Sequence, residues 1–413
     1  MPDQEIRTLR TEAEDILRHN ILPFWTDRMT DHDHGGYYGR MKGDGTLLPT
    51  ANKGCILSAR ILWAFSAAYR VLGDTRYLQA ATRARDYILR HFIDPLYGGT
   101  YWELDYLGRP VNTRKQFYAI GFTLYGMSEY LRATGDQTAA DCALELYHTL
   151  ETHAWEPRYG GYIEAQTRDW QTIADMRLSK KDANYPKSQN THLHILEPYT
   201  NLYRALSERT EIRCPQSARP VIAESLRRLI DIFCQRILNP ETHHLDLFFH
   251  NDWSRAAGHL ESYGHDIECS WLLHEAALTL ADPAILARVE PIVRQVAAAS
   301  EKGLNEDGSM THEANLDTGD VDADRHWWVQ AEAVVGFLNL YQHFGDRRSL
   351  KLALRTWSYI RTHLIDYEGG EWWWSCDPEG RINRTDDKAG FWKCPYHNSR
   401  LCLEILERFP IVH

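Results

Sequence analysis

Apolar residues recur at helical spacing in twelve segments of this 413-residue chain. Short stretches rich in glycine and aromatic residues separate these segments, without the regular alternation of strands and helices typical of a parallel sheet. The pattern predicts helices over residues 4–20, 53–72, 75–92, 116–134, 136–152, 190–208, 218–238, 264–280, 283–300, 326–344, 348–364 and 395–409. We therefore expect an all-α protein.

The loops carry a second regularity. Similar Gly/aromatic motifs occupy residues 35–38, 97–102, 159–162 and 368–373, and the first three recur at about sixty residues. Weaker counterparts at residues 244–249 and 308–310 fall where the two missing copies should be. A repeated unit of two helices and a hairpin indicates an array stacked on a shared core, and six units close into a ring.

The two helices of a unit differ in character. The helix over 75–92 keeps Arg76, Gln79 and Arg83 on a polar side, whereas the helix over 53–72 is apolar nearly all round. The first kind is typical of an outer helix and the second of an inner one. We predict an (α/α)6 barrel of six inner and six outer helices, forming a single domain over residues 1–413.

Composition and charge indicate which kinds of binding partner and which cellular compartment to expect. The formal net charge is −11, and no Lys/Arg block is long enough to follow a phosphate backbone, so a nucleic-acid partner is not expected. The charged N-terminus lacks an apolar signal core, and no run approaches a membrane-spanning length. Eight scattered cysteines without C-x-x-C spacing are typical of reduced thiols. We expect a cytoplasmic protein without a membrane partner. A monomer is the expected state, with a dimer as the alternative.

Polar residues gather at the predicted starts of the inner helices. All six inner helices run the same way, so these starts meet at one end of the ring. The residues concerned are Arg60, Gln116, Tyr118, Asn190, His194, Glu197, His265, Glu268, Trp328, Glu332, His397 and Arg400. Polar groups on buried helices need partners or a water-filled cavity. This predicts a polar pocket; the alternative is that the groups satisfy one another and only hold the ring together.

The chemistry of such a pocket follows from its residue types. Histidines titrate near neutrality, and Glu268, three residues after His265, can orient it. Three histidines with few carboxylates favour proton transfer over glycosidic cleavage, which needs a dominant pair of acids. Carbanion chemistry beside a carbonyl needs a base on each face, a role that His265 and His397 suit. No H-E-x-x-H motif or Cys/His quartet is present, so we expect no metal and no cofactor.

Six motifs appear together and in order: residues 97–105 (YGGTYWELD), 113–118 (TRKQFY), 190–197 (NTHLHILE), 264–268 (GHDIE), 326–332 (HWWVQAE) and 387–400 (DKAGFWKCPYHNSR). On these motifs the chain resembles the N-acylglucosamine 2-epimerase superfamily, and within it the cellobiose 2-epimerases. The resemblance covers essentially the whole length.

The resemblance implies an (α/α)6 barrel that epimerises C2 of a reducing-end sugar without metal or nucleotide. His397 would open the ring and act as acid/base on one face, His265 would act on the other, and His194 would steady the cis-enediol. The implied substrate-binding set is Arg60, Tyr118, Asp182, Asn190, Glu268, Trp328, Glu332, Trp392 and Arg400, with Trp392 stacking on the sugar and Asp182 in a substrate-side loop.

We thus expect an epimerase acting on a β-1,4-linked disaccharide such as cellobiose or lactose, with this small sugar as its partner. The nearest alternatives on the same scaffold are a mannose/glucose 2-epimerase and an aldose–ketose isomerase acting on free sugars. Alternatives of a different class are an (α/α)6 glycoside hydrolase and a non-catalytic sugar-binding barrel.

Overall fold

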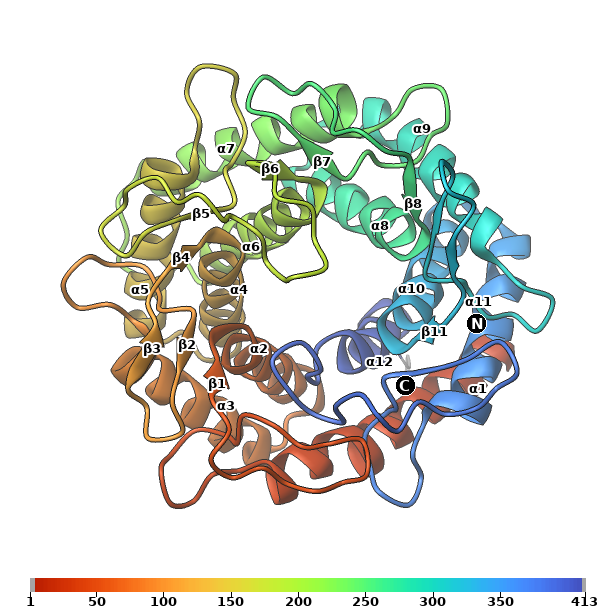
Figure 1. Ribbon diagram of the computed structural model, residues 1–413, viewed down its shortest axis with the longest axis horizontal. Helices are drawn as coiled ribbons and strands as arrows, with labels where there is room; N and C mark the ends of the chain where they lie inside the picture. Colours follow the sequence, from red (N-terminus) through yellow and green to blue (C-terminus); the bar gives the residue numbers. More distant parts are fainter. Residues whose placement is uncertain (1–3, 411–413) are drawn as a thin grey trace.

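The computed structural model describes residues 4–410, and the twelve α-helices of that part form two concentric rings (Figure 1). The inner ring contains α2 (Cys55–Leu72), α4 (Phe117–Thr134), α6 (Gln189–Glu208), α8 (Tyr263–Leu280), α10 (Trp327–Phe344) and α12 (His397–Arg408). The outer ring contains α1 (Gln4–Ile16), α3 (Thr75–Tyr87), α5 (Gln137–Thr149), α7 (Ala218–Ile232), α9 (Pro283–Ser300) and α11 (Arg347–Tyr359). The predicted (α/α)6 barrel is confirmed.

Burial explains which helices lie inside. On the outer helix α11 only one stripe is buried, including Leu350, Ala353 and Trp357, because the opposite side faces solvent. The inner helix α2 is covered from several sides and 72% buried. Among the described residues, α2 alone is long and apolar enough to cross a membrane, so our statement that no run approaches this length is wrong for α2. Its place in the inner ring accounts for that composition.

Most outer helices end in a five-residue π-helical turn that leads into a hairpin. These turns are Leu17–Ile21 and Phe24–Arg28 after α1, Ile88–Phe92, Leu150–Ala154, Phe233–Ile237 and Ile360–Leu364; α9 ends instead in a 3₁₀ turn, Glu301–Gly303. The hairpins close through bridges at Thr30–Tyr37, Ile93–Thr100, Trp155–Tyr162, Leu238–Leu245, Leu304–Met310 and Ile365–Trp372. All six units therefore carry the hairpin, including the two in which the motif is weak.

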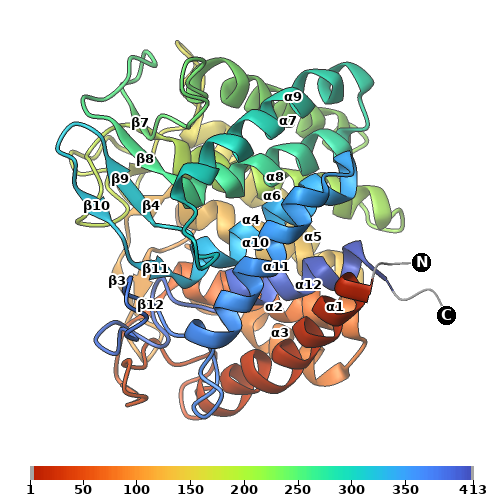
Figure 2. The same ribbon diagram turned by 90° about the vertical axis from the view of Figure 1, so that its right-hand side faces the viewer.

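Short strands link each unit to the next. They are β1 (Lys53–Gly54), β2 (Glu103–Leu104), β3 (Pro110–Asn112), β4 (Lys115–Gln116), β5 (Ala165–Gln166), β6 (Lys187–Ser188), β7 (Phe248–Phe249), β8 (Leu260–Ser262), β9 (Glu313–Asn315), β10 (Val321–Asp322), β11 (Arg325–His326) and β12 (Ser375–Cys376). They form antiparallel sheets β1-β2-β3, β4-β5, β6-β7, β8-β9-β10 and β11-β12. A bridge between Met41 and Ala389 joins the last unit to the first. Figure 2 shows the strands gathered at one end of the barrel.

Buried lysines hold these inner-helix starts to the hairpins. Lys115 Nζ donates to Asp94 Oδ2 (2.9 Å) and to the carbonyl of Gly98 (2.6 Å). Lys53 makes the same pair of contacts with Asp31 (2.7 Å) and Gly35 (2.8 Å) in the preceding unit. Because each lysine stands two residues before an inner helix, the charge pair sets where that helix begins.

Candidate active site

A cavity of about 420 Å³ opens at the end of the barrel where the inner helices begin. This volume lies in the range of about 300–1,000 Å³ usual for small-molecule sites. Ten of the twelve predicted site residues line it: Arg60, Tyr118, Asp182, Asn190, His194, His265, Glu268, Trp328, Trp392 and His397. The loops between β5 and β6 and between β12 and α12 reach over the central opening (Figure 1).

His265 lies in the first turn of α8. Its Nδ1 is 2.7 Å from the hydroxyl of Ser262, the N-cap residue, and its ring packs against Trp328 with centroids 4.8 Å apart. Burial lowers the pKa of His265 to about 3. The ring is therefore neutral near pH 7, with Nε2 left to meet a ligand.

His397 is the first residue of α12 and is oriented by a carboxylate. Its Nδ1 lies 2.7 Å from Glu332 Oε1, and Trp271 Nε1 donates to the other oxygen of Glu332 at 3.0 Å. Burial lowers the pKa of His397 to about 3, although Glu332 acts in the opposite direction. Because the carboxylate accepts the Nδ1 hydrogen, the Nε2 lone pair is available to take a proton.

His194, on α6 next to α8, is oriented in the same way by a carboxylate. Its Nδ1 lies 2.6 Å from Glu197 Oε1 on the next turn of α6, and its ring meets Tyr118 edge-on at 4.9 Å. Burial lowers the pKa of His194. Three imidazoles with defined orientations thus face one cavity.

A fully buried guanidinium beneath the cavity neutralises its acids. Arg400 donates to Glu197 Oε2 at 2.7 Å, and to Glu268 Oε1 and Glu332 Oε1 at 2.6 Å each. Burial, reinforced by the neighbouring Glu332, raises the pKa of Glu268 well above its usual value. Glu268 lines the cavity, and its Oε2 has no hydrogen-bond partner among the described residues.

Glu332 and Arg400 are the two predicted site residues that the structure does not bring to the cavity wall. The Arg400 side chain is 0% exposed and is used by three carboxylates, while the Glu332 oxygens are used by His397, Arg400 and Trp271. Both residues position the groups above them.

Arg60 and Tyr118 form a donor pair on the opposite wall. Arg60 Nη2 donates to the Tyr118 hydroxyl oxygen at 2.9 Å, and its guanidinium lies 4.1 Å from the centre of the Phe122 ring. Burial raises the pKa of Tyr118, so its hydroxyl keeps its hydrogen. The pair therefore presents hydrogen-bond donors rather than acid–base groups.

Sequence reasoning missed six residues of the wall: Leu178, Ser179, Lys181, Trp327, Trp374 and Asp386. Leu178, Ser179 and Lys181 lie in the same loop as the predicted Asp182. Trp327 precedes the predicted Trp328, while Trp374 directly follows the last Gly/aromatic motif. Nothing in the sequence alone pointed to Asp386.

A second hollow of about 240 Å³ adjoins the cavity. The two share the residues Leu178, Ser179, Lys181, Asp182, Asn190 and His265. Glu164 lies in this hollow with Oε1 unpaired, and burial raises its pKa to about 7. The site therefore has room on the loop side of His265.

By spacing alone, Glu268, Glu332 and His397 would suit a metal ion, because their ligand atoms lie within 4.8 Å of one another. Arg400, however, donates to both carboxylates and occupies the position of the cation. The His192/His194 pair is not arranged for zinc either, since His192 Nε2 accepts from the backbone N–H of Tyr162 at 2.9 Å.

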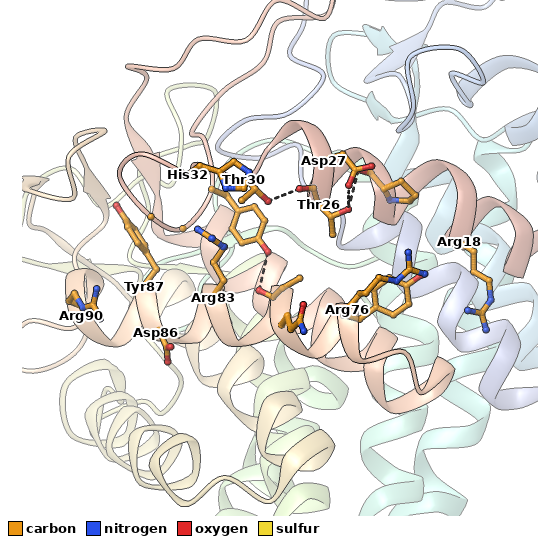
Figure 3. A pocket seen from close by; sticks show the side chains of 17 residues that line it. Arg18, Thr26, Asp27, Thr30, His32, Arg76, Arg83, Asp86, Tyr87 and Arg90 are labelled. Atoms are coloured by element: carbon orange, nitrogen blue, oxygen red, sulfur yellow. Dashed lines mark hydrogen bonds between the residues drawn. The ribbon is translucent and has the colours of Figure 1, made fainter.

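The outer wall also has a cavity, of about 660 Å³, between the α1 region and α3 (Figure 3). Arg18, Arg76, Arg83 and Arg90 line it. Its only histidine, His32, is exposed, and its carboxylates are exposed as well. It therefore lacks the desolvated, oriented acid–base groups of the barrel cavity.

Fold and site together define a class: an (α/α)6 barrel whose inner-helix starts surround a small-molecule cavity with oriented, neutral imidazoles. The model of the N-acylglucosamine 2-epimerase (GlcNAc 2-epimerase) family matches residues 36–400, and the chain belongs to this family.

Relatives in the family cover nearly the whole chain. A cellobiose 2-epimerase of Bacteroides fragilis is 52% identical over 398 residues, covering 96% of this chain and 98% of that protein. The structure of cellobiose 2-epimerase from Bacillus thermoamylovorans aligns with a TM-score of 0.90 at 39% identity, covering 98% and 100% of the two chains. A D-mannose isomerase of Marinomonas mediterranea is more distant, at 24% identity over 388 residues, 90% of this chain and 91% of that protein.

Proposed function

We propose that this protein is a cellobiose 2-epimerase that interconverts glucose and mannose at the reducing end of β-1,4-linked disaccharides. Family membership makes the chain an isomerase of the carbohydrate-epimerase type. The relative at 52% identity supports cellobiose as the substrate, and lactose shares the same reducing end.

The observation that carries the proposal is the pair His265 and His397. Both line one cavity, both contact the ring of Trp328, with centroids 4.8 and 5.7 Å away, and both have Nδ1 engaged. They come from α8 and α12, which are separated by α10, so they approach a sugar from different directions. Burial keeps both rings neutral, the state a general base requires.

The reaction then proceeds by two proton transfers. One imidazole Nε2 removes the proton from C2 of the open-chain sugar, and the C2 electron pair moves towards C1 while the C1 oxygen gains negative charge. Arg60, Tyr118 and His194 would hold the C1 and C2 oxygens of the resulting cis-enediol. The second imidazole, protonated at Nε2 by exchange with solvent before this step, gives that proton to the other face of C2, which inverts the configuration. The first imidazole then releases its proton to solvent.

Aromatic walls support binding of the sugar rings. Trp328 and Trp392 belong to the cavity wall, and the flat face of an indole suits the C–H face of a pyranose. Asp182 and Asn190, shared with the adjoining hollow, would bind hydroxyl groups on the loop side.

We further propose that catalysis needs no metal or cofactor and that the enzyme is a cytoplasmic monomer. Arg400 already supplies the positive charge that Glu268 and Glu332 require. All eight cysteines are free, in keeping with a reducing compartment.

The test is proton NMR of the purified enzyme in D₂O containing EDTA, with cellobiose, glucose and mannose supplied separately. Deuterium at C2 of a mannose-ended disaccharide is the expected result. Exchange with the free sugars alone would shift the assignment to a mannose/glucose enzyme, a ketose product would indicate an isomerase, and no exchange would refute proton transfer.

Matched variants assign the bases. His265→Asn and His397→Asn should each lower exchange by about 10²–10⁴-fold, the usual contribution of general acid–base catalysis. His274→Asn is the control, because His274 is buried on the same helix as His265 but lies outside the cavity wall. Equal losses in all three variants would mean that the effect is structural.

A further inference from the structure

A second cluster of imidazoles lies at the end of the barrel that holds the cavity, outside the acid–base set. His312 precedes β9, Asp322 ends β10 and His326 ends β11. The rings of His312 and His326 stack with centroids 4.2 Å apart and an interplanar angle of 22°. Asp322 Oδ2 lies 2.9 Å from His312 Nδ1 and 3.7 Å from His326 Nε2. One carboxylate oxygen thus faces two imidazoles.

These spacings are those of ligands around one ion. All three ligand atoms lie within 4.8 Å of one another. Zinc binds nitrogen and oxygen at about 2.0–2.2 Å, which places two ligands of a tetrahedral ion about 3.3 Å apart. The measured 2.9 and 3.7 Å bracket this value, whereas 3.7 Å is too long for a hydrogen bond.

The surrounding charge favours a dication. Asp322 and Asp324 both interact electrostatically with His326, and Glu313 beside the cluster interacts with Asp182 and Asp322 and, in the opposite sense, with His312 and Lys181. An excess of carboxylates around two imidazoles attracts a positively charged ligand.

We propose that His312, Asp322 and His326 bind one divalent transition-metal ion, with zinc the ion of choice. Two imidazoles and one carboxylate suit zinc, cobalt or nickel rather than magnesium or calcium, which prefer all-oxygen sites. The site leaves coordination positions open for water. Its ligands are not the proton-transfer residues, although His312 lines the same hollow as His265, and the proposal does not rest on the proposed function.

The location gives the ion a structural consequence. β9 and β10 belong to one sheet with β8, which leads directly into α8 and His265. His326 is the N-cap residue of α10, two residues before Trp328. A bound ion therefore ties the β8–β10 sheet to the start of α10, linking two elements of the cavity wall.

The test is calorimetric titration of the metal-stripped, full-length enzyme with Zn²⁺, Ni²⁺ and, separately, Mg²⁺, above about pH 7, where imidazole (pKa about 6.5) is neutral. We expect one Zn²⁺ or Ni²⁺ per chain and no Mg²⁺ binding. His312→Ala and Asp322→Ala should each weaken binding at least about tenfold, since losing even an outer-shell partner costs about 10–100-fold. Affinity should also fall at acid pH, because protons compete with the ion for the ligand atoms.

The chain offers a matched control in the same sheet. His259 Nδ1 lies 2.7 Å from Asp317 Oδ1, but this pair is exposed and belongs to no group of three ligands among the described residues. His259→Ala should bind Zn²⁺ like the wild type. Thermal unfolding with Zn²⁺ should raise the Tm of the wild type and of His259→Ala but not of Asp322→Ala. The proposal would be overturned if the wild type did not bind Zn²⁺, or if His312→Ala and Asp322→Ala bound Zn²⁺ with the affinity of the wild type.

Discussion

Glu332→Gln tests the orientation of His397 most directly. The carboxylate accepts from His397 Nδ1 at 2.7 Å, from Arg400 at 2.6 Å and from Trp271 Nε1 at 3.0 Å. The amide retains the size of the side chain but has one acceptor and one donor end. It cannot satisfy all three donors, and its lost charge no longer stabilises the imidazolium formed when His397 takes a proton.

The expected loss follows from that role. Glu332 fixes the tautomer of His397 and stabilises the imidazolium that His397 forms during the reaction. Its loss should therefore lower kcat for cellobiose by about 10²–10⁴-fold, the range of general acid–base catalysis. This corresponds to about 3–5 kcal/mol in the barrier. KM should change little, because Glu332 is not in the cavity wall. The variant should still fold, because Arg400 retains its ion pairs with Glu197 and Glu268.

The assay is steady-state kinetics with cellobiose, with C2 deuterium exchange measured in parallel and circular dichroism to verify folding. Trp271→Phe is the matched control, because it removes the indole N–H that binds the other Glu332 oxygen and keeps an aromatic ring beside Arg400. This control should cost about 1 kcal/mol or less in the barrier, under about tenfold in rate. A folded Glu332→Gln enzyme within tenfold of the wild type would refute the orientation argument.

Three further predictions concern stability and binding. The pKa of Glu164 is raised to about 7, so the folded state binds more protons than the unfolded chain between pH 4.5 and 7, and stability is lost as pH rises through 7. The free energy of unfolding of Glu164→Gln, relative to that of the wild type, should therefore be up to about 3 kcal/mol higher at pH 8 than at pH 5. If denaturant unfolding gave the same difference between the two proteins at both pH values, this prediction would be wrong. Asp94→Asn leaves the buried Lys115 without its carboxylate and should cost about 3–5 kcal/mol in urea unfolding; a cost under about 1 kcal/mol would show that the pair is not needed. Trp392→Ala should raise KM for cellobiose by about 2–12-fold with kcat nearly unchanged, the scale of one aromatic contact, whereas a lower kcat at constant KM would exclude stacking.

Much of the fold was predictable because it repeats. Apolar periodicity located all twelve helices, and hairpin motifs at four of six places were enough to infer a closed ring. The lysines that hold the inner-helix starts were overlooked, although Lys53 and Lys115 precede their helices by the same two residues. From the sequence, a lysine beside a polar loop is predicted to be exposed to solvent. Only the structure shows that the side chain of Lys115 is fully buried.

The sequence by itself determined which residues stand at the inner-helix starts, because helical periodicity and direction are local properties. That was sufficient to place eight of the predicted residues in the cavity wall, and the family resemblance added the loop residues Asp182 and Trp392. The tertiary structure decided how they are paired. His397 meets Glu332 across 65 residues and Arg400 meets Glu197 across 203, contacts that no local pattern encodes. The same closure of the ring desolvates the imidazoles and keeps them neutral, because burial disfavours their charged form.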